Sequence, residues 1–219
     1  MEIIEATWIF GVMLAFAAIT PPALHYLKGK NFAASLQFPE NQPNSPELTI
    51  VLPVRNESIV IRDKLDEIVG MEYPMSRVSI LVLDSASTDR TGSIARQYLK
   101  KNAGEASWKI ENVKRPGKSV ALNLALDFIE TEFFVMMDAD AMLPPSSLRL
   151  LSRWFQDPGI GAVCGQLDSH HGSRGHPYRS RFNVLRVGES AIDSTPIFEG
   201  SICAFRMSAI GHSRIDSGN

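Results

Sequence analysis

Four short apolar runs, each followed by polar residues, constrain the fold of this chain most strongly. Apolar residues at helical spacing occupy the stretches between them, and the runs are 48–54 (LTIVLPV), 78–84 (VSILVLD), 108–113 (WKIENV) and 132–137 (EFFVMM). Continuous apolar strands that alternate with helices are typical of a mostly parallel sheet covered on both faces. The sequence therefore predicts an α/β domain, and its 219 residues allow one sizeable domain plus an appendage.

The amino-terminal segment is the expected appendage. Residues 3–27 are almost wholly apolar, and a helix of this length can cross a bilayer. Lys28 and Lys30 follow directly, so the positive-inside rule places the rest of the chain in the cytoplasm. The alternative is a core or amphipathic helix broken at Pro21 and Pro22.

The chain is accordingly expected to have three parts: a transmembrane anchor over 1–30, a proline-bearing linker over 31–47, and an α/β domain over 48–219. With 22 basic and 24 acidic side chains the chain has almost no net charge, so it has no overall electrostatic attraction to nucleic acid, and we expect no nucleic-acid partner. Cys164 and Cys203 lie in apolar surroundings without a paired spacing, which argues against a zinc site or a disulfide scaffold.

The residues that follow each predicted strand are the place to expect a ligand. In open α/β sheets, ligands bind in the crevice outside the carboxyl ends of the strands. The polar residues at these ends are, in chain order, Arg55, Asn56 and Glu57; Asp84, Ser85, Ser87 and Asp89; Lys114, Arg115 and Lys118; and Asp138 and Asp140. The sequence therefore predicts that acidic and basic side chains meet around one crevice.

Asp138 and Asp140 form a D-x-D pair at the end of the most hydrophobic strand. Two carboxylates in this position would repel each other and any phosphate unless a hard cation lay between them. Mg²⁺ and Mn²⁺ take one or two carboxylates together with substrate phosphate oxygens. The pair therefore predicts a divalent cation that shares a diphosphate ligand, and the alternative is that the aspartates only end a strand.

The basic cluster of Lys114, Arg115 and Lys118 supplies positive charge for the same diphosphate, and Gly117 allows close backbone approach near a helix start. The alternative is a solvated basic face. Asp84 would then accept hydrogen bonds from a base or a ribose. A nucleoside diphosphate is the predicted ligand, because no G-x-G-x-x-G motif follows a predicted strand and no G-x-x-x-x-G-K-[ST] loop is present.

Four motifs in order, LPVRNES, VLDSASTD, KRPGKSVALNLAL and MMDADAML, resemble those of the family-two inverting glycosyltransferases. The resemblance covers about residues 48–210. It implies the GT-A (Rossmann-like) fold, preceded here by the transmembrane helix. It also implies a metal-dependent hexosyltransferase that uses Mg²⁺ or Mn²⁺ and a nucleotide-diphosphate sugar, a UDP-sugar being the expected donor, and that inverts the anomeric carbon.

The resemblance also implies roles for individual residues. Asp84 matches the residue that contacts the base. The family commonly has D-D-G at this point, whereas this sequence has Asp84-Ser85-Ala86, so guanine stays open as the base. The segment FEGSICAFRMSAI matches the acceptor side. The implied residues are Pro53, Asn56, Glu57, Asp84, Arg115, Lys118 and Asp138 for the donor nucleotide, Asp138 and Asp140 for the metal, and Gly200 and Arg206 for the acceptor side.

The general base that the resemblance implies has no match in this sequence. Asp216 is the only carboxylate after Arg206, and its surroundings do not match the family's acidic pair. Three explanations stay open: the chain is a truncated piece, a partner subunit supplies the rest, or the protein binds donor without efficient transfer. A membrane-anchored nucleotide-sugar-binding subunit and a nucleotidyltransferase are the rival functions.

A cytosolic domain on a membrane anchor implies an acceptor at the membrane surface, either a polyprenyl phosphate or a growing glycan, as in polysaccharide biosynthesis. Arg174, Arg179 and Arg181 lie in a glycine- and histidine-bearing segment that is expected to be a loop over the acceptor site. We expect these arginines to meet a lipid phosphate there.

Overall fold

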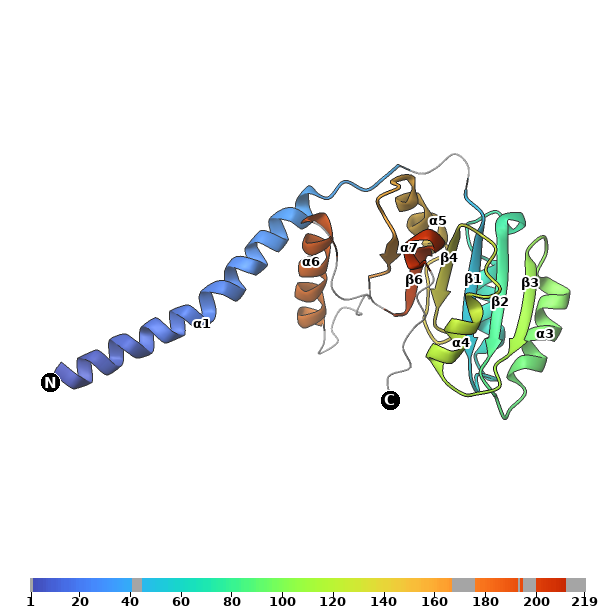
Figure 1. Ribbon diagram of the computed structural model, residues 1–219, viewed down its shortest axis with the longest axis horizontal. Helices are drawn as coiled ribbons and strands as arrows, with labels where there is room; N and C mark the ends of the chain where they lie inside the picture. The colour runs from blue at the N-terminus through green and yellow to red at the C-terminus, as the bar shows by residue number, and fades with distance from the viewer. Residues whose placement is uncertain (1, 41–44, 167–175, 193, 195–199, 212–219) are drawn as a thin grey trace. The chain divides into compact units, whose positions relative to one another are not determined.

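The computed structural model describes residues 2–40, 45–166, 176–192, 194 and 200–211 (Figure 1). It divides into two compact units. The helical unit combines the amino-terminal residues 1–37 with residues 166–198, and the sheet unit comprises residues 38–165 and 199–219.

The sheet unit contains, within its described residues, a six-stranded sheet in the order β3-β2-β1-β4-β6-β5. Neighbouring strands among the first four pair in parallel, while β6 runs antiparallel to β4 and β5. The strands are β1 (Leu48–Val54), β2 (Val78–Asp84), β3 (Ser107–Asn112), β4 (Phe133–Met137), β5 (Ala162–Cys164) and β6 (Ile202–Arg206). The mostly parallel α/β fold predicted from the sequence is confirmed.

Helices cover both faces of this sheet, because its strands are apolar on both faces. Ile50 and Leu52 of β1 belong to one core, and Val51 belongs to the other. The first core includes residues of α2 (Ile61–Val69), α3 (Thr91–Asn102), α5 (Ser147–Ser152) and the short 3-10 helices η1 (Met75–Arg77) and η2 (Arg153–Gln156). The second includes residues of α4 (Lys118–Ala125) and α7 (Met207–Ile210).

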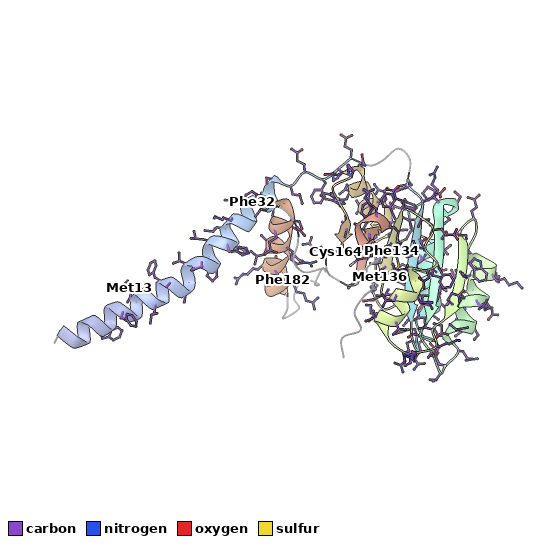
Figure 2. The ribbon with its side chains drawn as sticks, in the orientation of Figure 1. Met13, Phe32, Phe134, Met136, Cys164 and Phe182 are labelled. Carbon is purple, nitrogen blue, oxygen red and sulfur yellow. The ribbon has the colours of Figure 1, made fainter. Side chains whose placement is uncertain are left out.

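The strand register sets the functional edge of the sheet. In the parallel part, Val54, Asp84 and Asn112 are partners at the carboxyl ends of β1, β2 and β3. On the other side of β4, the antiparallel strand β6 begins at this edge and ends at the opposite one. Phe134 of β4, labelled in Figure 2, lies in this part of the sheet, and its ring stacks on that of Phe205 of β6 with centroids 5.1 Å apart.

The helical unit pairs α1 (Glu2–Ser35) with α6 (His176–Ile192), two helices far apart in the sequence. Gly29 and Gly188 lie at the crossing, where a side chain on Gly188 would collide with the Gly29 backbone. His25 Nε2 lies 3.2 Å from Glu189 Oε1. Small residues let the two backbones approach closely.

Helix α1 is continuous through its two prolines and is apolar around its whole circumference. Its large side chains are exposed, for example Trp8 (73%) and Phe16 (72%). Met13 lies on the part of α1 away from α6 (Figure 2). Among the described residues, one helical stretch, Phe10–Ser35, has the length and composition to cross a membrane.

Candidate functional site

The loops after β1 and β2 are tied together at the carboxyl edge of the sheet. Asn56 adopts a left-handed backbone conformation (φ 56°), which asparagine tolerates better than most residues. Its backbone N–H donates to Ser87 Oγ at 3.0 Å, and its side-chain oxygen accepts from Thr88 N at 2.8 Å. Asn56 therefore fixes the shape of two loops. This structural role is separate from its predicted contact with the donor nucleotide, which stays a prediction.

Asp84, the last residue of β2, is buried at this edge. Its Oδ1 accepts from Ser87 N at 3.0 Å, and its Oδ2 packs against Gly92, where an added Cβ would lie 2.5 Å away. The neighbouring Ser85 Oγ accepts from Gly117 N at 3.0 Å. The loop before α4 is thereby joined to the end of β2.

Asp84 also lines an open cleft of about 600 Å³ beside α3 and the end of β3. Its wall contains Asn112 of β3 together with Ser93 and Gln97 of α3. Three basic residues line it as well, namely Arg90, Arg96 and Lys100. The cleft therefore offers hydrogen-bonding groups and positive charge on one side of Asp84.

Glu57 connects the first loop to the D-x-D pair through its electrostatics. Burial, followed by the negative charges of Asp140 and Asp89, raises the pKa of the Glu57 carboxyl above its usual value. Its backbone N–H donates to Thr91 Oγ1 at 2.8 Å. Glu57 and Asp140 are therefore close enough to repel each other, although 83 residues separate them in the chain.

Asp89 lies beside Glu57 and holds the start of α3. Its carboxylate accepts hydrogen bonds from the hydroxyl and the backbone N–H of Thr91 and from Ser58 N. The bond from the Thr91 hydroxyl, followed by the others, keeps the pKa of Asp89 well below its usual range. Asp89 is therefore an ionised carboxylate that adds negative charge to this crevice.

Asp138 follows β4, and its carboxylate is partly exposed. Lys118, the first residue of α4, places its Nζ 2.6 Å from Asp138 Oδ1. Asp138 N donates to Ser201 O at 3.1 Å, which brings the neighbouring Gly200 toward the D-x-D pair. The structure thus joins three of the predicted strand ends, carrying Glu57, Lys118 and Asp138, around one crevice.

The donor set suits a hard divalent cation that shares its ligands with a diphosphate. Asp138 and Asp140 supply carboxylate oxygens, and burial together with the negative charges of Asp140 and Asp89 raises the pKa of the nearby Glu57 carboxyl. In the described part of the chain, no three His, Cys, Asp or Glu side chains gather closely enough to hold a metal ion by themselves. Mg²⁺ is commonly held by one or two carboxylates plus substrate phosphates.

Arg206 lies away from this crevice. It pairs with Phe133 at the start of β4, and Asp138 lies five residues further along, roughly 17 Å away at the rise of a strand. Its guanidinium donates to Glu132 Oε1 at 2.6 Å and to the carbonyl oxygens of Phe155, Asp157 and Ile160. Arg206 therefore fastens the segment before β5 to the sheet, and this geometry does not support the predicted acceptor-side role.

The other predicted residues have simple placements. Pro53 is half-buried near the end of β1, while Arg115 and Lys114 are exposed in the loop before α4. Arg179 and Arg181 are exposed at the start of α6. Asp216 and Arg174 lie outside the described residues.

The sequence reasoning missed one charged residue next to this site. Lys64 is buried on the apolar face of α2, with Ile61, Leu65 and Ile68 as its neighbours on that face. Its Nζ donates to Ala141 O, in the loop after the D-x-D pair. The sequence pattern that could have identified Lys64 is a lysine among apolar residues at helical spacing.

Known proteins resemble this chain in both sequence and structure. The probable glycosyltransferase YdaM of Bacillus subtilis is 33% identical over 134 residues, which are 58% of this chain and 31% of that protein. The beta-monoglucosyldiacylglycerol synthase of Synechocystis is 28% identical over 170 residues, 71% of this chain and 34% of that protein. The chain thus spans about a third of the length of these relatives.

A solved structure of the mannosyltransferase PcManGT from Pyrobaculum calidifontis, in complex with GDP-Man and Mn²⁺, superposes with a TM-score of 0.77 at 32% identity. The match covers 89% of this chain and 55% of that protein. The family model of glycosyl transferase family 2 matches residues 49–213, three quarters of the chain. Those residues include all of the described sheet except Leu48, and all the carboxylates of the crevice. The chain belongs to glycosyl transferase family 2.

Proposed function

We propose that this chain is the donor-binding part of a glycosyltransferase that transfers a sugar, with inversion and with the help of a divalent cation, from a nucleotide-diphosphate sugar to a membrane-associated acceptor. The observation that carries this proposal is the crevice where Lys118 contacts Asp138 while Glu57 and Asp140 interact electrostatically. It combines carboxylates for a cation with a lysine for a phosphate, at the sheet edge where ligands of α/β folds bind.

Each side chain of the crevice has a distinct proposed task. Asp138 and Asp140 hold the cation, and the chemistry that a bound divalent cation supplies is neutralisation of charge on the leaving diphosphate. Lys118 donates to the diphosphate, since its Nζ already lies beside Asp138. Asp84 is oriented by Ser87 and accepts a hydrogen bond from the base.

Inversion follows when the acceptor oxygen attacks the anomeric carbon once, from the face opposite the diphosphate. If the acceptor is a glycan, a general base takes the proton from its attacking hydroxyl in this step; a lipid phosphate would attack through an ionised oxygen. We assign that base to none of the described residues. Gly200 is the acceptor-side residue that we retain, because its neighbour Ser201 bonds to Asp138 at the crevice.

The base of the donor is proposed to be uracil, with guanine as the second candidate. Uracil is expected from the resemblance of the sequence motifs. Guanine is favoured by one observation, the likeness to a mannosyltransferase whose structure was determined with GDP-Man. The cleft beside Asp84 supports either base, because its polar and basic lining can contact any nucleoside.

A membrane-associated acceptor is proposed on the basis of α1. An apolar helix whose large side chains are exposed all around needs an apolar environment. The name of the Synechocystis relative, a beta-monoglucosyldiacylglycerol synthase, describes a glycolipid product. We propose that α1 anchors the protein with its sheet unit on the cytoplasmic side, and that the acceptor is a lipid phosphate or a growing glycan.

The test is calorimetric titration of UDP and, separately, GDP into the full chain with and without Mn²⁺. The variants are Asp138→Asn and Asp140→Asn, and Asp63→Asn on the exposed face of α2 is the matched control. We expect Mn²⁺-dependent binding of one nucleotide in the wild type and the control. We expect each D-x-D variant to lose at least tenfold in that affinity, because mutating even the groups that support metal ligands from outside the coordination shell typically costs 10- to 100-fold.

Binding that ignores both Mn²⁺ and the D-x-D substitutions would refute the proposed site. Incubation of the longest native form of the protein with labelled nucleotide sugar and membrane lipids then separates an enzyme from a binding subunit. An enzyme transfers the label to lipid or glycan, whereas a binding subunit retains the donor unchanged.

A further inference from the structure

Two side chains of α2, Lys64 and Glu67, hold the loop that follows the D-x-D pair. Lys64 Nζ donates to Glu67 Oε1 and to Ala141 O, both at 2.6 Å. Glu67 Oε2 accepts from Leu143 N at 3.3 Å. The two side chains therefore bind the carbonyl and the amide on either side of Met142, whose own side chain is 91% exposed.

These contacts reach the proposed metal ligands through one turn of backbone. Ala141 N donates to Asp138 O at 3.3 Å, so residues 138–141 form a turn that contains both aspartates, here called the D-x-D turn. Ala141 is thus bound at its N–H within the turn and at its carbonyl by Lys64. The backbone of Asp140 lies between two fixed points, which restricts the directions in which its carboxylate can point.

Hydrophobic burial does not require this ion pair. The Lys64 side chain is 1% exposed and Glu67 is 26% exposed, so the lysine loses nearly all of its hydration. Replacing such a buried pair with apolar residues of similar volume is often neutral or stabilising. The α2 neighbours Ile61, Leu65 and Ile68 are fully buried aliphatic residues. An apolar residue at position 64 would therefore suit this core, but it could not hold Ala141 O.

We propose that Lys64 and Glu67 are positioning residues that keep the D-x-D turn in the conformation that binds the divalent cation. The inference rests on the proposed function, because the cation at Asp138 and Asp140 is part of that proposal. Groups that orient metal ligands from outside the coordination shell typically change metal affinity by 10- to 100-fold when mutated. The ion pair gives α2 a direct mechanical connection to the cation site.

The test compares the wild type with Lys64→Met and with the double variant Lys64→Met/Glu67→Met, which removes both charges together. Asp66→Asn is the matched control, because Asp66 also lies on α2 but accepts its hydrogen bond from Tyr98 of α3. Mn²⁺ binding is measured by electron paramagnetic resonance and nucleotide binding by calorimetry, with and without Mn²⁺. Urea unfolding reports stability.

We expect both Lys64 variants to bind Mn²⁺ and the Mn²⁺-dependent nucleotide about tenfold more weakly than the wild type. Nucleotide affinity without metal should stay close to the wild-type value in both variants. The urea midpoint should stay close to wild type in the double variant, whereas Lys64→Met alone leaves Glu67 without its partner and should lower it. The Asp66 control should bind like the wild type. Unchanged Mn²⁺ affinity in both Lys64 variants would overturn the inference and leave the proposed function intact.

A parallel loss of stability, metal-free affinity and metal-dependent affinity would also overturn the inference, because it would identify a purely structural pair. If the wild type itself shows no metal-dependent nucleotide binding, the proposed function fails and the inference fails with it. The behaviour of the wild type thus distinguishes the two failures.

Discussion

Substituting Gly92 with alanine tests how tightly the site holds Asp84. Gly92 is the second residue of α3 and has an ordinary helical backbone, and alanine in a helix is favoured over glycine by about 1 kcal/mol. Helix propensity alone therefore predicts that Gly92→Ala makes the protein more stable. The packing against Asp84 predicts the opposite sign.

The expected magnitude follows from the position of the carboxylate. The new Cβ would lie 2.5 Å from Asp84 Oδ2, whereas ordinary contacts begin at 3.4 Å. Asp84 must move, and its rigid carboxylate also accepts the hydrogen bond from Ser87 N at 3.0 Å. A hydrogen bond to a charged group contributes about 1.5–3 kcal/mol. After the gain in helix propensity, Gly92→Ala should lower the free energy of unfolding by about 1 kcal/mol.

The assay is urea unfolding followed by the fluorescence of Trp108 and Trp154, which both belong to the sheet unit. The matched control places Gly92→Ala in an Asp84→Ala background, where the collision is absent and alanine should be stabilising. This double-mutant cycle isolates the contact between the two residues. If Gly92→Ala stabilises the protein equally in both backgrounds, Asp84 is not held against α3 as described.

Three further substitutions separate the structural residues from the proposed donor residues. Arg206→Met should lower the free energy of unfolding by about 2 kcal/mol, because it leaves several carbonyl groups without a donor. Nucleotide affinity should stay unchanged. Weaker nucleotide binding at unchanged stability would contradict the structural role of Arg206. Lys118→Met should strengthen the binding of Mn²⁺ alone by a few-fold, because Asp138 loses a competing cation, and should weaken nucleotide binding in calorimetry. If the Mn²⁺ affinity and the nucleotide affinity both rose or both fell, Lys118 would not lie between the cation and the diphosphate. Asp89→Asn should have a lower Tm than the wild type at pH 7, because hydrogen bonds from Thr91 lower the pKa of Asp89 in the folded protein. The difference in Tm between the two proteins should shrink as the pH falls below about 4. A difference that grows on acidification would refute these hydrogen bonds as the source of the low pKa.

Local sequence patterns predicted the four parallel strands well and the ends of some helices poorly, while the bounds of β5 and β6 were not predicted. The runs 48–54 and 78–84 coincide with β1 and β2, and β3 differs from the predicted strand by one residue at each end. Residues 119–130 (SVALNLALDFIE) have the pattern of a helix, but α4 ends at Ala125. A buried strand must be apolar along its whole length, whereas a helix end depends on packing and capping that its periodicity does not specify.

The D-x-D pair and the basic residue Lys118 were identified from their positions after apolar runs. Parallel strands that point the same way bring such residues to one edge, and the contact of Lys118 with Asp138 agrees with that reasoning. The direction of β6 could not be inferred in the same way. Its antiparallel pairing carries Arg206 to the opposite edge, although Gly200, six residues earlier, precedes the strand at the crevice.

The sequence by itself determined which chemical groups stand at the carboxyl edge of the sheet, because strand periodicity and chain order are local properties. Only the tertiary structure decided which distant groups meet. It paired Lys64 with Ala141, 77 residues apart, and α1 with α6 across Gly29 and Gly188. The physical reason is that such contacts depend on strand direction, register and close packing between segments, and local sequence patterns carry no information about these.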